Sequence, residues 1–163
     1  MLRVFNVLCV LAAVLMISAP SAQAQQRPAT PLATFPTAKL SIIASSGEAS
    51  SGRHEFTVEI ARTRRQQTQG LMFRRRLAGD AGMLFVYRRV GIVSMWMRNT
   101  YIPLDMLFVG ADGKIAHIAQ RTTPHSLETI SSTEPVKSVL ELNAGTVARL
   151  KIRIGDQVSS PAL

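Results

Sequence analysis

Short apolar stretches, separated by residues typical of turns, recur along the chain from about residue 39 onward. In residues 55–60 polar and apolar side chains alternate strictly, which predicts a half-buried strand. Thr63 is placed to cap a short helix that Gly70 would end. Further strands are predicted at residues 39–44, 83–87, 92–97, 105–109, 114–120 and 136–142. This rhythm predicts a mainly β fold, an antiparallel β-sandwich or jelly-roll-like barrel with one or two short helices.

The clearest hairpin turn is residues 110–113, because Gly113 after Asp112 can adopt a positive φ angle. Both faces of this hairpin are largely apolar, so we expect it to be central, with residues 71–73 filling the core nearby. Pairing across the turn puts two sets of side chains on opposite faces: Asp105, Leu107 and Val109 with Ala116, Ile118 and Gln120, and Met106 and Phe108 with Ile115, His117 and Ala119.

The first 24 residues have the pattern of an export signal. Arg3 precedes an apolar run over residues 7–17, and a small-x-small pattern ends at Ala24. The run is shorter than the about 20 residues that a spanning helix needs. We therefore expect cleavage after Ala24, with a retained membrane anchor as the alternative.

The organisation that follows is simple. Residues 25–36 are predicted to be a Pro-rich tether, and residues 37–159 a single β-sandwich domain in the periplasm or outside the cell. The mature chain would not be a transmembrane protein. It would also lack a thiol, because Cys9, the only cysteine, lies in the signal.

Positive charge is concentrated in one segment. The chain carries a formal net charge of +9, and residues 62–89 hold eight arginines against the single acid Asp80. Without an aromatic-interleaved motif, and in an exported protein, this favours an anionic envelope surface over nucleic acid. The alternative is a solvated face that keeps the protein soluble. The candidate surface residues are Arg62, Arg64, Arg65, Arg74, Arg75 and Arg76.

The only tryptophan begins a segment with opposite charges at its two ends. If residues 99–104 close a hairpin loop, Arg98 lies across from Asp105, and Trp96 lies on the same face. An aromatic ring, a guanidinium and a carboxylate side by side could bind a glycan or a small polar ligand. Alternatively, the charges form a structural ion pair beside a core tryptophan. The candidate ligand-binding residues are Trp96, Arg98, Asn99, Asp105 and Glu141.

Over roughly residues 40–158 the chain resembles the domain of unknown function 192 (DUF 192) family. The resemblance implies a mostly β, jelly-roll-like sandwich with short helices, often exported, and it supplies no reaction. Trp96, Arg98, Asn99 and Asp105 are signature positions of that family. The motifs that carry the resemblance are Gly70-Leu71-Met72, Gly82-Met83-Leu84-Phe85, Trp96-Met97-Arg98-Asn99-Thr100, Ile102-Pro103-Leu104-Asp105, Val139-Leu140-Glu141-Leu142, Gly145 and Gly155-Asp156.

The sequence offers little catalytic chemistry. The three histidines are scattered, with His117 expected in the core, so we predict no metal site and no cofactor. No serine elbow or phosphate loop is present. Asp105 and Glu141 could form the carboxylate pair of a glycan hydrolase if they lie about 5–10 Å apart. Glu141, between two leucines, is expected to face solvent or to pair with Arg98 or Arg121. The sequence therefore favours non-enzymatic binding over catalysis, and predicts neither the ligand nor the oligomeric state.

Overall fold

The computed structural model describes residues 32–45 and 52–163. The predicted signal and most of the predicted tether lie outside the described residues. Residues Leu32–Leu163 form one unit. Within the described ranges, no helix is both long and apolar enough to cross a membrane.

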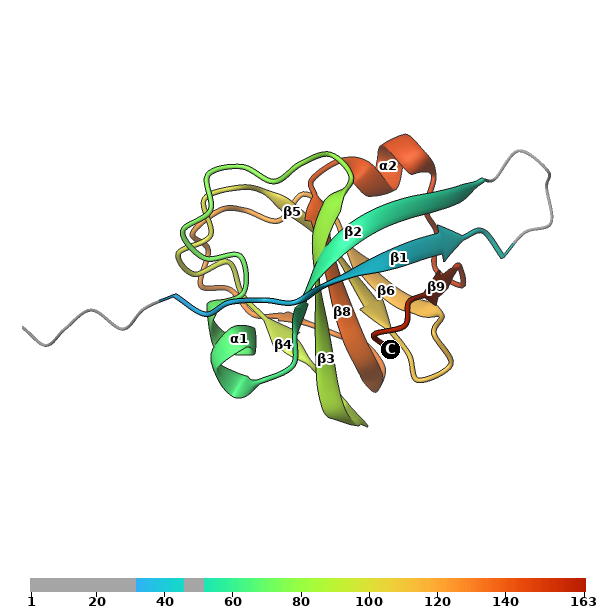
Figure 1. The fold of residues 1–163 in the computed structure, drawn as a ribbon, viewed down its shortest axis with the longest axis horizontal. Helices are drawn as coiled ribbons and strands as arrows, with labels where there is room; N and C mark the ends of the chain where they lie inside the picture. Colours follow the sequence, from blue (N-terminus) through green and yellow to red (C-terminus); the bar gives the residue numbers. More distant parts are fainter. Residues whose placement is uncertain (1–31, 46–51) are drawn as a thin grey trace, which may run out of the picture. The chain divides into compact units, whose positions relative to one another are not determined.

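Seven strands form one curled, mixed sheet in the order β6-β5-β8-β3-β2-β1-β9 (Figure 1), which confirms the mainly β prediction. A second sheet pairs two short strands, β4 (Ser94–Met95) and β7 (Ile130–Ser131). The helices are α1 (Arg64–Gln69) and α2 (Thr146–Leu150). The strands of the large sheet are β1 (Thr37–Ile43), β2 (Arg53–Ala61), β3 (Ala81–Gly91), β5 (Leu104–Val109), β6 (Ile115–Ala119), β8 (Val136–Asn143) and β9 (Gln157–Ser159).

Two predictions about the strands are wrong. β2 and β3 pair in parallel, because the chain returns through α1 instead of a tight turn, so the sheet is mixed and not purely antiparallel. Residues 92–97 do not form a strand of the large sheet. Both edges of β8 are occupied, by β3 and by β5, so this segment cannot pair with β8. Only residues 94 and 95 form a strand, β4, which pairs with β7.

The curled sheet has two apolar faces, each with its own core. β9 hydrogen-bonds to the start of β6, with Val158 N donating to Gly113 O at 2.8 Å, so the two edges of the sheet meet at one corner. We call the two core clusters inner and outer. The inner cluster contains Leu140 and Leu142 of β8, and the outer cluster contains Val139 of the same strand. The outer cluster lies between the sheet and the segments that cover it, including Leu71 and Met97.

The predicted hairpin of β5 and β6 forms up to a bulge, but its central position is wrong, because β6 is an end strand of the sheet and is mostly half-buried. Leu107 pairs with Ile118, and Phe108 pairs with His117. The ring centres of Phe108 and His117 lie 5.3 Å apart. The register then shifts, so that Ile115 pairs with Val109. One extra residue on β6 turns Ile115 to the inner core, opposite to its predicted face.

Helix α1 forms as the capping pattern predicts. Thr63 Oγ1 accepts from Gln66 N at 3.3 Å, Gln66 Oε1 accepts from Thr63 N at 3.0 Å, and Gly70 ends the helix with φ +47°. No residue of α1 is buried. Polar contacts therefore hold the helix, among them Gln67 Nε2 donating to Val86 O at 2.9 Å.

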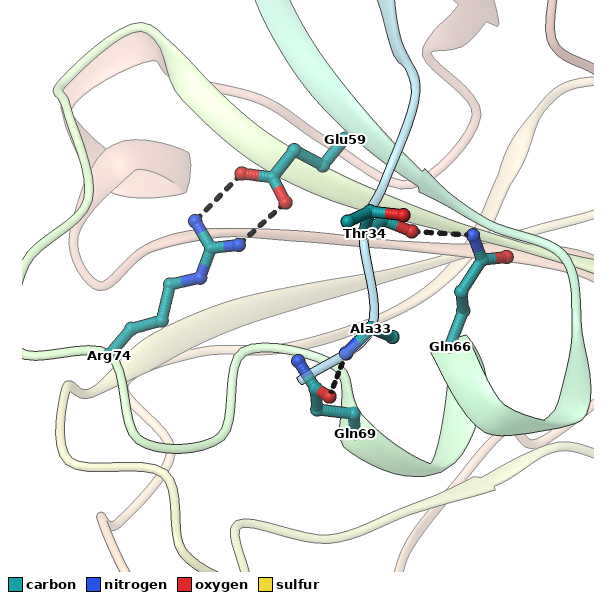
Figure 2. A network of polar contacts seen from close by, with 6 residues as sticks. All are labelled: Ala33, Thr34, Glu59, Gln66, Gln69 and Arg74. Carbon is teal, nitrogen blue, oxygen red and sulfur yellow. Dashed lines mark hydrogen bonds and ion pairs between the residues drawn. The ribbon is translucent and has the colours of Figure 1, made fainter. Parts of the chain in front are cut away.

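The end of the predicted tether is bound to the domain, as Figure 2 shows. Ala33 N donates to Gln69 Oε1 at 2.6 Å, and Gln66 Nε2 donates to Thr34 O at 2.8 Å. Phe35 packs against the outer core cluster. Residues 33–36 therefore connect α1 with the sheet, where Pro36 O accepts from Ile60 N at 2.8 Å, although the sequence predicts them as tether.

The chain leaving α1 fills the core only in part. Leu71 is buried as predicted, but Phe73 is 46% exposed, so its predicted place in the core is wrong. Phe73 has φ +66°, a left-handed conformation that is unusual for a bulky residue. This backbone turns its ring outward.

Candidate functional site

A pocket of about 280 Å³ lies between α1 and the outer face of the large sheet. α1 and the residues after it form one wall, β3 contributes Phe85 and Tyr87, and β8 contributes Glu141. Met95, Trp96 and Thr100 form the remaining side. The lining combines aromatic and aliphatic side chains with polar ones, most of which come from α1.

Glu141 is the acidic residue of this pocket and is 4% exposed. On β8 it pairs with Met83 of β3 and Met106 of β5, so it stands in the middle of the sheet among apolar neighbours. Within residues 32–45 and 52–163, no group hydrogen-bonds to its carboxyl. Our expectation that Glu141 faces solvent, or pairs with Arg98 or Arg121, is wrong, because β8 is a central strand and both of its faces are covered.

Burial raises the pKa of Glu141 to about 8. The cause is desolvation, which disfavours the charged form, and no nearby cation offsets it. At pH 7 the carboxyl is therefore mostly protonated. In that form it can donate one hydrogen bond and accept others.

Tyr87 is another ionisable group that lines the pocket. Its hydroxyl donates to Met95 Sδ at 3.3 Å, and its pKa is raised well above the usual value by burial and, secondarily, by Glu141. Both groups are thus uncharged at neutral pH. The interior of the pocket offers neutral hydrogen-bonding groups between aromatic and thioether surfaces.

Trp96 is 45% exposed and lines the pocket, and the Arg98 guanidinium lies 5.6 Å from the centre of its ring. Asn99, with φ +55°, makes the turn that follows. The predicted pairing of Arg98 with Asp105 is wrong. β5 pairs with β6 and β8, so Asp105 lies opposite Leu142, and no hairpin joins it to Trp96.

Asp105 is fully buried and has a structural position. Its Oδ1 accepts from Arg121 N and its Oδ2 from Val147 N, both at 2.9 Å. Because Asp105 pairs with Leu142 and Glu141 pairs with Met106, the two carboxyl groups point to opposite faces of the sheet. They do not share a cleft, as a two-carboxylate hydrolase requires.

The candidate arginines differ in their surroundings. Arg74 makes a two-pronged ion pair with Glu59, at 2.7 and 2.6 Å (Figure 2), and Arg62 donates to Ala162 O. Arg64 lines the Glu141 pocket. Arg75 lies over the ring of Tyr101, 5.5 Å from its centre. Arg65 and Arg76 are exposed.

Comparison with known proteins agrees with this architecture. The family model DUF192, described as "Uncharacterized ACR, COG1430", matches residues 47–160. The chain therefore belongs to the DUF192 family, and the predicted resemblance is confirmed.

Two solved structures are similar. A protein of Sinorhizobium meliloti 1021, described as a putative transcription regulator, is 46% identical, with a TM-score of 0.75 over 80% of this chain and 98% of its own. A protein of unknown function from Novosphingobium aromaticivorans DSM 12444 is 38% identical, with a TM-score of 0.73 over 80% of this chain and 89% of its own. Comparison with curated proteins gave no match.

Four separate sequence motifs of the resemblance meet at the pocket. Residues 70–72, Phe85, Glu141 and both ends of the segment 96–100, Trp96 and Thr100, line it. Sequence reasoning missed Tyr87 and the polar side chains of α1. One sequence signal could have identified the buried acid. Glu141 is the acidic residue of the apolar run 139–142, and an acidic residue in such a run is buried if its strand is central.

Metal ligands do not gather at this site. In the described part of the chain, no three histidine, cysteine or acidic side chains lie close enough to hold an ion together. The pocket combines the neutral acid of Glu141, the phenol of Tyr87 and aromatic walls with the Arg64 guanidinium and the polar side chains of α1.

Proposed function

We propose that this protein binds a small neutral polar ligand, of the size of one sugar ring, in the Glu141 pocket. The observation that carries the proposal is the carboxyl of Glu141, which belongs to a 4% exposed residue, lines the pocket and makes no hydrogen bond to the described residues. A ligand in the pocket can supply that hydrogen bond.

Size and lining support this ligand class. A volume of about 280 Å³ is near the lower end of known ligand sites, which suits a single ring and not a long chain. Trp96 offers a half-exposed ring on which an apolar face of a sugar can stack. The protonated Glu141 can donate to a ligand hydroxyl or carbonyl without placing a charge in the pocket.

Binding is better supported than hydrolysis. A raised pKa would suit Glu141 to the role of general acid. Among the described residues that line the pocket, however, no second carboxylate is present to act as base or nucleophile. We therefore assign the pocket a binding role.

Thermal melts with N-acetylglucosamine, glucose and glycerol test this proposal. At 100 times its dissociation constant a ligand adds about 2.7 kcal/mol, or about 10 °C for a domain of this size. We expect a sugar to raise the melting temperature. Glu141→Leu, which removes the hydrogen-bonding carboxyl, and Trp96→Ala should each weaken binding at least tenfold, whereas Glu141→Gln should retain it within a few fold.

Tyr101→Ala is the matched control for Trp96→Ala, because Tyr101 is an exposed ring outside this pocket. It should leave sugar binding unchanged. Equal loss in both aromatic variants, or sugar binding that survives Glu141→Leu, would contradict the assignment. Loss of binding in Glu141→Gln would point instead to a cationic ligand that needs the carboxylate.

We also propose that the protein meets its ligand outside the cytoplasm. The support is the sequence of residues 1–24, which has a positive start, an apolar run and a small-x-small end. Mass spectrometry of the protein from its native host is expected to find Gln25 as the first residue. An intact N-terminal segment on the cytoplasmic fraction would contradict this proposal.

A further inference from the structure

A second cluster of functional-type side chains lies outside the Glu141 pocket. Arg75, Tyr101 and His125 line a concavity of about 430 Å³. The Arg75 guanidinium lies 5.5 Å from the centre of the Tyr101 ring, and the His125 ring lies 5.1 Å from it, tilted by 39°. Three segments far apart in the sequence therefore bring a guanidinium, a phenol and an imidazole to one space.

The hydrogen-bond donors of this cluster have no acceptor in the protein. Among the described residues, nothing accepts from the Arg75 guanidinium, the Tyr101 hydroxyl or the His125 ring. Arg74 differs sharply from its neighbour, because Glu59 already neutralises it through two hydrogen bonds. Arg75 instead stacks on Tyr101, which leaves the edges of its guanidinium available.

The backbone around the cluster is held in an unusual conformation. Phe73, Asn99 and His125 have φ angles of +66°, +55° and +62°. Phe73 N donates to Asn99 O at 2.8 Å, and His125 N donates to Thr100 O at 3.2 Å, so the three segments are tied together. Such left-handed residues cost free energy and gather at binding sites.

The chemistry of the three donors selects an oxyanion. A guanidinium and an imidazole both form charge-assisted hydrogen bonds with phosphate oxygens, and a tetrahedral group accepts from several directions at once. The exposed ring of Phe73, at 6.3 Å and edge-on to Tyr101, adds an apolar surface beside these donors. A phosphate group that carries an apolar or aromatic substituent fits both features.

We propose that Arg75, Tyr101 and His125 form a binding site for a phosphate monoester. The phosphate is held by the three donors, and its substituent lies against Phe73. The same phosphate chemistry occurs in soluble esters and in the headgroup of phosphatidic acid. This site is separate from the Glu141 pocket, so either assignment can fail without the other.

The test compares Arg75→Ala with Arg76→Ala. Both variants remove one positive charge from adjacent exposed positions, but only Arg75 lines the concavity. Calorimetric titration with phenyl phosphate is expected to show binding that Arg75→Ala weakens at least tenfold, while Arg76→Ala changes it less than twofold. Tyr101→Phe, which removes only the hydroxyl, should weaken it by a smaller factor.

Vesicles distinguish the source of the phosphate. Each arginine variant is sedimented with phosphatidylcholine vesicles that contain phosphatidic acid and with vesicles of phosphatidylcholine alone. Because both variants carry the same N-terminal segment, any binding by that segment is equal in the two and does not affect their difference. If Arg75→Ala weakens phenyl phosphate and vesicle binding, the site takes a lipid headgroup; if only phenyl phosphate is affected, it takes a soluble ester. Either result supports the proposal. Equal effects of the two arginine variants on phenyl phosphate, or no phenyl phosphate binding, would overturn it.

Discussion

Replacing Glu141 by glutamine is expected to remove most of the pH dependence of stability between about pH 4.5 and pH 8. The folded protein holds the carboxyl proton up to about pH 8, whereas the unfolded chain releases it near pH 4.5. Through this window the unfolded state binds fewer protons, so the free energy of unfolding falls as the pH rises. The wild type should lose about 1.4 kcal/mol per pH unit relative to Glu141→Gln.

Urea denaturation at pH 5, 6, 7 and 8 measures this difference. The two proteins should be similarly stable near pH 5, and the variant should be the more stable by several kcal/mol at pH 8. Glu128→Gln, which changes an exposed loop carboxyl, serves as the control and should follow the wild type. Parallel curves for the wild type and Glu141→Gln would mean that the carboxyl ionises normally and is not desolvated.

Replacing Asp105 by alanine is expected to destabilise the protein by about 3–5 kcal/mol, because two backbone N–H groups lose their side-chain acceptor. One of them, Val147 N, is buried at the start of α2. The melting temperature should fall by about 12–20 °C, at about 4 °C per kcal/mol. Thermal unfolding followed by circular dichroism measures the loss.

Asp112→Ala is the matched control, because Asp112 is exposed and accepts one N–H, from Lys114, in the turn after β5. Its effect should stay below about 1 kcal/mol. If the melting temperature of Asp105→Ala were as near to that of the wild type as the melting temperature of Asp112→Ala, the side chain of Asp105 would not stabilise the fold.

Elements with strong local signals could be predicted from sequence. The alternation in residues 55–60, the Thr63 cap and the turn at Gly113 each act through neighbouring residues, and the structure has all three. The parallel pairing of β2 with β3 could not be predicted in this way. It depends on how the chain crosses over through α1, which no local pattern records.

The candidate site was predicted only in part, for the same reason. Trp96 and Glu141 do line one pocket, but the hairpin expected to join Arg98 with Asp105 does not exist, because β8 takes the place beside β5. That neighbour is distant in sequence. Glu141 likewise is a buried acid only because β3 and β5, from two other parts of the chain, flank β8 and distant segments cover its face.

The role of the basic segment also depended on tertiary contacts. Arg74 and Arg75 are adjacent in sequence, yet one is neutralised by Glu59 and the other stacks on Tyr101. The net charge of the segment counts both arginines equally and does not distinguish their contacts. Only the fold separates a structural arginine from one whose donors remain available.

Carbon-13 NMR titration of the Glu141 carboxyl, with and without saturating N-acetylglucosamine, tests the central claim most directly. Without the sugar, the midpoint should lie near pH 8, since burial raises this pKa. A neutral ligand that accepts the proton of Glu141 in a hydrogen bond favours the protonated form, so the sugar should move the midpoint upward. A midpoint near 4.5 without the sugar, or one that the sugar leaves in place or lowers, would contradict the account.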